Sequence, residues 1–372
     1  MESIEQMIKR LCPKGVEYVK LGEVCELERG KVFSKKYIEE HPGQYPVFSS
    51  QTANNGELGK IDTYDYNGEF LTWTTDGAYA GTIFYREGKF SITNVCGLIK
   101  NNDTMFNIKF LFHWLRLVAK NYVYSGMGNP KLMSNQTAEI LIPVLTMEVQ
   151  NRIVEILDKM TMLTAELEAE LEARKQQYEY YRNKLLTFNE IGGIRFVKLG
   201  DVCELGTGSH NTQDGLIEGL YPFYTRGIDI LFLNEYDYDE TAIVTAGDGA
   251  GVGKVIHFVK GKYSLHQRAY RIVADEQQVL AKYVYHYMKA TFYNYIIRSS
   301  VSSSVTSVRK PMLYDYPIPI PPLSEQQRII SILDRFEALT TDLQSGLPAE
   351  IEARRQQYEY YRNKLLTFDQ AV

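Results

Sequence analysis

The sequence has few cysteines, and the way they are spaced excludes a disulfide-rich class of protein. It has 372 residues and four cysteines, Cys12, Cys25, Cys96 and Cys203, none of which forms a Cys-x-x-Cys pair. With no signal peptide at the start of the sequence, we expect these thiols to stay reduced in a cytoplasmic protein. No apolar run is long enough to cross a membrane.

The sequence also lacks motifs for catalysis or metal binding. Its histidines show no metal-ligand spacing such as HExxH, and no GxSxG motif or Asn-Pro-Pro-Tyr methyltransferase motif is present. The glycine-rich stretch 245–255 departs from a phosphate-binding loop at Asp248 and Val255, and it does not match the dinucleotide fingerprint. We therefore expect neither catalytic residues nor a metal site.

An excess of positive charge is missing too. Lys and Arg number 41 against 46 Asp and Glu, which gives a net charge of −5. This balance does not favour nucleic-acid binding, because strong binders carry a basic face. Net charge ignores distribution, however, and the alternating glutamates at 166–172 fall in a predicted helix, where they place negative charge away from a binding face.

What the sequence does contain is an internal repeat that covers both halves. QQYEYYRNKLLTF occurs at residues 176–188 and again at 356–368, and VKLGEVCEL at 19–27 matches VKLGDVCEL at 197–205. Cys25 and Cys203 take equivalent positions in the repeat, so we expect both to be small core residues.

Each tyrosine-rich block ends a predicted long helix. Apolar residues three and four apart run from Ile153 to Phe188 and from Ile329 to Phe368, which is a seam of coiled-coil type. Each helix would span about 40 residues, or roughly 60 Å. The second copy carries extra residues that include Gly346 and Pro348, which predict a kink or a short break. Its start offers a capping box, Ser324 with Gln327.

Loop-rich segments alternate with these helices. The predicted parts are a first recognition domain at 1–145, a first long helix at 146–190, a second recognition domain at 191–322 and a second long helix at 323–372. Runs at 70–75, 82–85 and 95–99 favour strands, and 107–119 has helical spacing. The expected fold class is α+β: two repeated mixed α/β domains separated by a long antiparallel two-helix coiled coil with pseudo-twofold symmetry.

The two halves share their frame and differ in their loops, which is typical of two readers of different targets. Drift after duplication is the alternative. Asn and Gln can read adenine, Arg and Lys can read guanine, and Ser, Thr and Lys can hold phosphates. The candidate contacts in the first half are Ser50, Gln51, Thr52, Asn54, Asn55, Thr75, Tyr79, Lys131, Ser134 and Asn135. Those in the second half are Thr225, Arg226, Lys254, His266, Gln267, Arg268, Ser303, Ser304, Thr306, Ser307, Arg309 and Lys310.

Two further interpretations concern single residue types. Asp76 and Asp248 begin related glycine turns, where a carboxylate either bonds the turn itself or accepts from a cytosine amino group; the turn role is favoured.

On the helices, Tyr and Arg beside the seam are typical of buried subunit interfaces. The candidate subunit-binding residues are Tyr180, Arg182, Asn183, Tyr360, Arg362 and Asn363.

Taken together, these motifs resemble the specificity subunits of type I restriction–modification enzymes, and the resemblance covers essentially the whole chain. It is carried by the VKLG(E/D)VCEL starts, the Tyr-Pro strands, TDGAYAGTIFY, GDGAGVGKVIHF, IPIPPLSEQQRIISILD and the doubled QQYEYYRNKLLTF. The first helix departs from the pattern, because LIPVLTMEVQNRIVEILD lacks the Pro-Pro and Glu-Gln pairs. This departure affects where the first helix starts.

The resemblance implies that each domain reads one half of a bipartite site in double-stranded DNA. It also implies that the helices set the spacing and dock two methyltransferase subunits. Those partners would bind S-adenosylmethionine, restriction subunits would use ATP and Mg²⁺, and this chain would hold no cofactor and perform no catalysis. Two alternatives stay open: a coiled-coil scaffold with two ligand-binding domains and no DNA role, and an enzyme whose site has no familiar motif.

Overall fold

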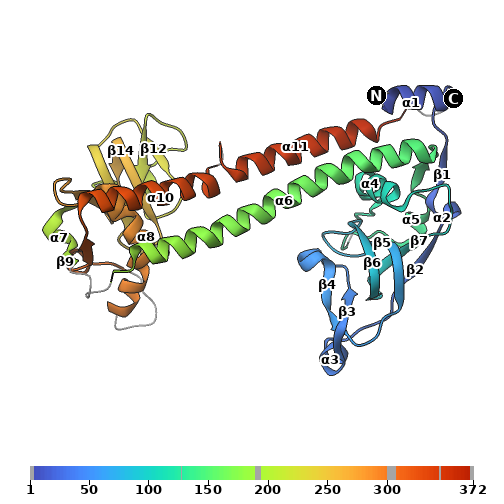
Figure 1. Ribbon diagram of the computed structural model, residues 1–372, viewed down its shortest axis with the longest axis horizontal. Coiled ribbons are helices and arrows are strands. Elements are labelled where there is room, and N and C mark those ends of the chain that lie inside the picture. Colours follow the sequence, from blue (N-terminus) through green and yellow to red (C-terminus); the bar gives the residue numbers. More distant parts are fainter. Residues whose placement is uncertain (1–3, 127, 189–193, 300–306, 343–344, 369–372) are drawn as a thin grey trace. The chain divides into compact units, whose positions relative to one another are not determined.

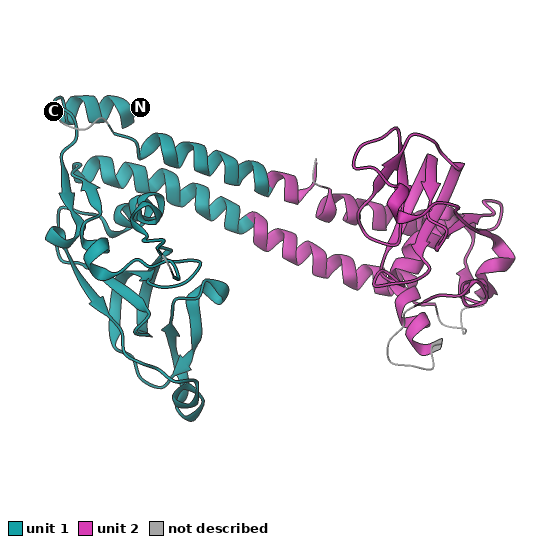
Figure 2. Ribbon diagram, turned by 180° about the vertical axis from the view of Figure 1, so that it is seen from behind, with its two compact units in different colours: residues 1–166, 351–372 teal, residues 167–350 magenta. Residues whose placement is uncertain are grey.

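The computed structural model describes the chain apart from residues 1–3, 127, 189–193, 300–306, 343–344 and 369–372 (Figure 1). The chain divides into two compact units, shown in different colours in Figure 2. Unit 1 comprises Met1–Glu166 and Ile351–Val372, and unit 2 comprises Leu167–Glu350. The predicted boundaries treated the two long helices as parts separate from the domains. In the structure, each compact unit includes a portion of both long helices.

A six-stranded mixed sheet is the centre of unit 1. Its strands lie in the order β2-β7-β5-β6-β3-β4, and every neighbouring pair is antiparallel except β3 with β6. The strands are β2 (Cys25–Arg29), β3 (Pro42–Phe48), β4 (Glu57–Ile61), β5 (Tyr66–Thr74), β6 (Ile83–Ile92) and β7 (Cys96–Asn101). A separate antiparallel pair joins β1 (Tyr18–Lys20) to β8 (Leu141–Pro143). The predicted strand runs are confirmed as parts of β5, β6 and β7, except that their end residues Thr75, Thr82 and Val95 lie just outside these strands.

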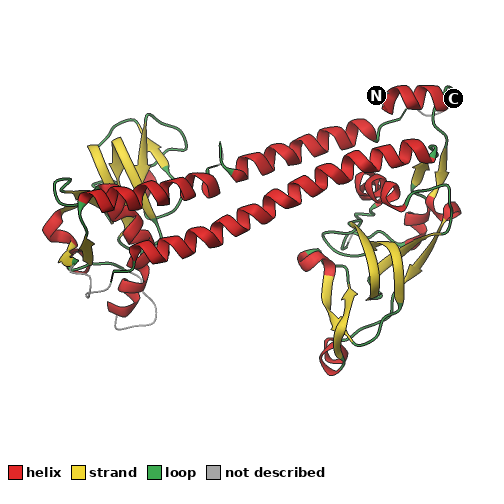
Figure 3. Cartoon of the chain, in the orientation of Figure 1, coloured by secondary structure: helices red, strands yellow, loops and turns green. Residues whose placement is uncertain are grey.

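The helices of unit 1 precede or connect its strands, and the one that follows β7 packs against β5 and β6 (Figure 3). They are α1 (Ile4–Leu11), α2 (Leu21–Val24), α3 (Lys35–Glu40), α4 (Ile108–Val118) and α5 (Ser134–Ala138), with short 3₁₀ turns η1 (Ala53–Gly56) and η2 (Ala119–Tyr122). Helix α4 begins where its spacing predicts, because the Asn107 side chain accepts hydrogen bonds from Lys109 N and Phe110 N and so caps the first turn. Its buried face, which includes Trp114, packs into a core with Trp73 of β5.

Unit 2 repeats this sheet strand for strand. The order is β10-β15-β13-β14-β11-β12, again with one parallel pair, β11 with β14. The strands are β10 (Cys203–Thr207), β11 (Tyr221–Tyr224), β12 (Leu231–Leu233), β13 (Tyr238–Ala246), β14 (Ile256–Leu265) and β15 (Ala269–Ala274), and β9 (Arg195–Lys198) pairs separately with β16 (Pro317–Ile320). The helices are α7 (Leu199–Val202), α8 (Ala281–Ser299) and α9 (Lys310–Tyr314), with the 3₁₀ turn η4 (Thr212–Asp214). Cys25 and Cys203 are both buried, as expected for equivalent core residues.

The long helices follow the predicted seam with one correction. Helix α6 (Met147–Leu186) is continuous over 40 residues, whereas the second copy is split into α10 (Leu323–Thr341) and α11 (Leu347–Leu365). The predicted break near Gly346 is therefore confirmed. The predicted capping box was wrong: α10 has Pro322 as its N-cap and no side-chain cap. The Pro322 carbonyl instead accepts from Glu325 N and Gln326 N at 2.9 and 3.0 Å.

The helices pack in the antiparallel sense inside each unit. In unit 1, Ile153 and Leu157 near the start of α6 share a core with Leu366 just beyond the end of α11. In unit 2, Leu186 at the end of α6 shares a core with Ile329 and Leu333 near the start of α10. Start and end meet in both cores, so the paired helices run in opposite directions. Among the described residues, no helix is both long enough and apolar enough to span a membrane.

Candidate nucleic-acid interface

In each unit, loops from distant parts of the chain are tied together at one end of the sheet. In unit 1, Thr93 N donates to Phe48 O, Asn94 N to Lys31 O and Leu132 N to Thr75 O, all at 2.8–2.9 Å. The equivalent bonds in unit 2 are His266 N to Tyr224 O, Gln267 N to His210 O and Val308 N to Gly247 O, at 2.7–3.0 Å. The same backbone frame therefore holds two different sets of loops. We call them the loop face of unit 1 (residues 30–34, 49–56, 75–81, 93–95, 124–126 and 128–132) and the loop face of unit 2 (residues 208–213, 225–230, 247–254, 266–268 and 307–310).

A glycine turn with a leading aspartate lies at the centre of each loop face. Gly77 and Gly249 have φ of 94° and 82°, a region that favours glycine. The Asp76 carboxylate accepts from the Thr75 hydroxyl at 2.8 Å and lies 3.8 Å from Lys131 Nζ. The favoured role for both aspartates was to bond their own turn. Within the described residues, the structure instead shows both carboxylates binding side chains outside the glycine turn.

Asp248 makes shorter contacts with cationic side chains than Asp76 makes with Lys131. Its two oxygens each accept from an arginine, Arg226 Nη1 and Arg268 Nη1, and both distances are 2.9 Å. Burial of the Asp248 carboxyl raises its pKa, but hydrogen bonds from the two guanidinium groups outweigh burial and leave the pKa below its ordinary value. Asp248 is therefore ionised at neutral pH and links the loops that follow β11 and precede β15.

The structure brings most of the first-half candidates to the loop face of unit 1. Ser50, Gln51, Thr52, Asn54 and Asn55 lie in or beside η1, and the two asparagines are exposed and have left-handed φ of 48° and 53°. Tyr79 and Lys131 are exposed on neighbouring loops. Thr75 is fully buried and fastens the loops through its hydroxyl. Ser134 and Asn135 belong to α5, which packs against α2.

The second-half candidates divide in a similar way. Arg226, Gln267 and Arg268 line a concavity of about 400 Å³ on the loop face of unit 2. Thr225 and His266 are buried and hold the loops from beneath. Lys254 is exposed, with its ammonium group 5.1 Å from the centre of the Tyr293 ring. Ser307, Arg309 and Lys310 are exposed as well, whereas Ser303, Ser304 and Thr306 lie outside the described residues.

Two features of the loop faces were missed by the sequence analysis. Asn211, Thr212 and Gln213 also line the concavity of unit 2. The sequence does contain a signal for these three residues: the segments after the two VCEL blocks, ERGKVFSKK and GTGSHNTQD, differ strongly, as the other candidate loops do. In unit 1, the side chain of Arg86 is buried beneath the loop face, with its guanidinium carbon 3.6 Å from the centre of the Phe48 ring. Burial lowers its pKa to about 10. No sequence pattern distinguishes this arginine from one on a solvent-facing strand.

The candidate subunit-binding residues form two copies of one surface, which we call the tyrosine surfaces. One consists of Tyr180, Arg182 and Asn183 on α6, and the other of Tyr360, Arg362 and Asn363 on α11. The side chains of Tyr180 and Tyr360 are 60% and 62% exposed, and each ring meets the next tyrosine edge-on with centroids 5.3 Å apart. The arginines lie over Tyr178 and Tyr358 at 5.6 and 5.8 Å. Identical sequence thus gives the same ring arrangement in separate units, although Arg362 donates to Asn363 Oδ1 while the buried Arg182 Nε has no hydrogen-bond partner in the described structure.

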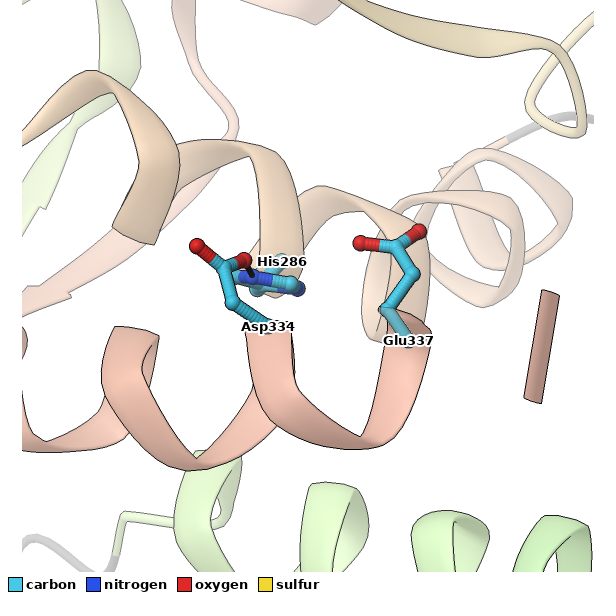
Figure 4. A group of neighbouring side chains, drawn as sticks. All are labelled: His286, Asp334 and Glu337. Carbon is cyan, nitrogen blue, oxygen red and sulfur yellow. Dashed lines mark hydrogen bonds and ion pairs between the residues drawn. The ribbon is translucent and has the colours of Figure 1, made fainter. Parts of the chain in front are cut away.

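A buried histidine joins a long helix to each domain. His113 Nε2 lies 2.8 Å from Asp158 Oδ1, and the equivalent His286 Nε2 lies 2.6 Å from Asp334 Oδ1. In unit 2, Glu337 completes a group in which ligand atoms of three residues lie within 4.8 Å of one another (Figure 4). Lys289 Nζ is 2.7 Å from Glu337 and Lys282 Nζ is 3.6 Å from Asp334. Because ammonium groups already neutralise both carboxylates, we interpret this group as a helix–helix contact rather than a metal centre.

Comparison with known proteins gives one consistent result. A family model described as the type I restriction modification DNA specificity domain matches residues 13–174 and again 192–353. A protein of Mycoplasma pneumoniae named as a type I specificity subunit is 31% identical over 93% of this chain and 96% of its own length. A protein of Haemophilus influenzae named as a type I restriction enzyme specificity subunit is also 31% identical, over 95% of this chain and 96% of its own length.

A solved structure shows the same fold at lower sequence identity. The type I restriction-modification S subunit from M. genitalium matches with a TM-score of 0.63 and 15% identity, over 94% of this chain and 95% of that chain. The two matched segments correspond to the two repeats, and each contains one of the sheets with its loop face. None of these comparisons supports a scaffold without a role in DNA recognition. The chain belongs to the family of type I restriction–modification specificity subunits, and it carries two copies of the DNA specificity domain.

Proposed function

We propose that the loop face of unit 1 and the loop face of unit 2 each read one half of a bipartite site in double-stranded DNA. The observation that carries this proposal is the contrast between a shared frame and different side chains. Equivalent backbone bonds hold the loops in both units, yet the loop face of unit 1 presents Asn54, Asn55 and Tyr79, whereas the loop face of unit 2 presents Arg226 and Arg268. Amide and guanidinium groups prefer different bases, so the two half-sites would differ in sequence.

We further propose that the two tyrosine surfaces dock two methyltransferase subunits. Exposed tyrosine next to arginine is the composition of an interface hot spot, and the two surfaces have matching geometry. Two identical surfaces suit two copies of one partner. S-adenosylmethionine would be bound by those partners, and ATP and Mg²⁺ by restriction subunits, so this chain would contribute recognition and no catalysis. The net charge of −5 fits a chain that holds DNA together with its partners.

Helix α6 is the proposed spacer between the two readers. It is continuous over 40 residues, and residues up to Glu166 belong to unit 1 while those from Leu167 belong to unit 2. An uninterrupted helix rises about 1.5 Å per residue, so its length would set the number of base pairs between half-sites. Inserting one helical turn into α6 would then lengthen the spacing without changing either half-site.

Methylome sequencing tests the reading proposal. The full chain, expressed with its methyltransferase partner, should produce a split adenine-methylation motif. Exchanging Asn54 and Asn55 for Ala should alter one half of that motif, and Gln267→Ala should alter the other half. A single contiguous motif, or variants in both faces that change the same bases, would contradict the proposal.

Co-purification tests the docking proposal. Tyr180→Ala combined with Tyr360→Ala should lower the amount of bound methyltransferase, and either change alone should leave about half. The matched control is Gln176→Ala with Gln356→Ala, since these residues are exposed and occupy equivalent positions in the same blocks. Equal retention of the partner by the tyrosine and glutamine variants would place the docking surface elsewhere.

A further inference from the structure

Two arginines of unit 2 converge on one carboxylate from different loops. Arg226 follows β11, Arg268 precedes β15, and Asp248 lies in the turn after β13. Each guanidinium donates through Nη1 to its own oxygen of Asp248. A carboxylate shared by two arginines fixes the planes of both groups, because an ionised pair restricts a long side chain that would otherwise sample many rotamers.

The outer member of this group is available to a ligand. The Arg268 side chain is 63% exposed, compared with 39% for Arg226 and 21% for Asp248. Arginine carries five N–H donors in a rigid fork, and within the described residues the Arg268 side chain donates to Asp248 through Nη1 alone. The other N–H donors of Arg268 therefore remain available to a ligand, and the contact with Asp248 already sets the orientation of the exposed guanidinium.

The backbone beneath Arg268 is fixed as well. Arg268 N donates to Nδ1 of the buried His266 ring at 2.9 Å, which requires that nitrogen to be unprotonated. Burial lowers the pKa of His266, so the ring is neutral and able to accept at pH 7. Beside it, the Gln267 amide donates to Asn211 Oδ1, and these residues line the same concavity as the two arginines. Side chain and main chain thus hold Arg268 in one place.

Unit 1 has no such fork among its described residues. Equivalent positions in the shared frame hold Val95 in place of Arg268 and Ser50 in place of Arg226. Asp76 meets Lys131 at 3.8 Å, and an ammonium group is a point charge without a planar pair of donors. Arg29, the last residue of β2, donates to Asn94 O at 2.6 Å and to Thr75 Oγ1 at 3.2 Å. The pre-oriented fork is therefore a property of the second loop face.

We propose that Arg268 reads a guanine in the half-site bound by unit 2, and that Asp248 and Arg226 position its guanidinium for that contact. Guanine offers O6 and N7 as neighbouring acceptors in the major groove, which match a pair of donors on one guanidinium. The group carries two positive charges against one negative charge, so it also attracts the phosphate backbone. This inference rests on the proposed function, and it assigns a base and a residue to one of the two readers.

The test uses the chain assembled with its methyltransferase partner and duplexes that carry the methylated motif. Each guanine of the two half-sites is replaced in turn by 7-deazaguanine, which lacks the N7 acceptor, and binding is measured by competition. For the wild-type complex we expect one position in the unit 2 half-site where replacement weakens binding by at least about 5-fold. For Arg268→Ala and for Arg268→Met, which lack the guanidinium donors, the same replacement should change binding by less than about twofold.

Controls separate base reading from folding. Arg195→Ala removes another exposed arginine of unit 2, at the start of β9, and should retain the full penalty for replacement. Asp248→Asn should reduce the penalty at that guanine alone, because Arg268 loses its ionic partner. A structural role for Arg268 would weaken binding to every duplex equally and leave the penalty unchanged.

The outcomes distinguish the two proposals. A wild-type complex that methylates no split motif would overturn the proposed function. A split motif together with an undiminished penalty in Arg268→Ala and Arg268→Met would overturn only the assignment of Arg268. The assignment also fails if no 7-deazaguanine in the unit 2 half-site weakens wild-type binding.

Discussion

Gln150 offers the sharpest test of how the first long helix is anchored to its domain. Its side chain is fully buried. Its amide nitrogen donates to Met105 O and Leu145 O at 2.8 Å each, and its oxygen accepts from Asn107 N at 2.8 Å. Gln150→Ala would leave these backbone groups without their partner. A net cost of about 0.5–1.5 kcal/mol for each lost bond gives a loss of roughly 2–4 kcal/mol in the free energy of unfolding.

Tryptophan fluorescence is the assay, because both tryptophans of the chain, Trp73 and Trp114, lie in the core of unit 1. With a urea m-value of about 2 kcal/mol/M, the midpoint of the fluorescence transition should fall by roughly 1–2 M. The control is Lys159→Ala, an exposed change on the same helix that should move the midpoint by less than about 0.3 M. Equal midpoints for the two variants would refute the idea that Gln150 anchors α6.

Four further predictions follow from buried and partly buried groups. A Cβ at Gly97 would lie 2.2 Å from the Trp73 ring, so Gly97→Ala should cost about 1–3 kcal/mol in the same fluorescence assay, while Gly128→Ala, with nothing within 4 Å, should be close to neutral. Tyr358 Oη lies 3.4 Å from His113 Nδ1, whereas the buried Tyr178 hydroxyl has no hydrogen-bond partner in the described structure. Tyr358→Phe should therefore lower the free energy of unfolding, measured by thermal denaturation, by about 0.5–1.5 kcal/mol. Tyr178→Phe removes no hydrogen bond, so the amides of α10 should keep their protection against hydrogen exchange. Burial raises the pKa of both Cys25 and Cys203 to about 12, so both should resist thiol reagents at pH 8 while the more exposed Cys12 reacts. Since these pKa values lie above the ordinary thiol value, stability from the buried thiols is present below pH 9 and is lost as pH rises towards 12, which alkaline urea titrations would detect.

The repeat and the helices were predictable from sequence because their signals are local. The sequence predicted a first long helix over 146–190, with an apolar seam from Ile153 to Phe188, and the structure gives α6 as Met147–Leu186. The first helix lacks the Pro-Pro and Glu-Gln pairs, yet it starts where predicted. Gln150 accounts for this, since Gln326 makes the same three kinds of bond in unit 2, to Leu280 N, Gln278 O and Pro321 O. The glutamine at the position of Gln150 and Gln326 is thus the residue of the Glu-Gln pattern that anchors each long helix to its domain.

Residue type alone was a weaker guide to the candidate interface. The differing loops contained most of the residues that the structure gathers on the loop faces, but burial separated Thr75, Thr225 and His266 from their exposed neighbours. Polarity does not reveal burial, because a hydroxyl or imidazole that bonds the backbone beneath a loop has the same sequence signature as one that faces solvent.

The sequence by itself determined the duplication, the long helices and the family, because repeated blocks and helical periodicity depend on residues close together in the chain. Only the tertiary structure decided which side chains meet across loops and helices. Arg226, Asp248 and Arg268 come from three separate loops, and His286 reaches Asp334 across 48 residues. Such contacts depend on strand order and helix packing, which bring distant segments together only after the core has formed.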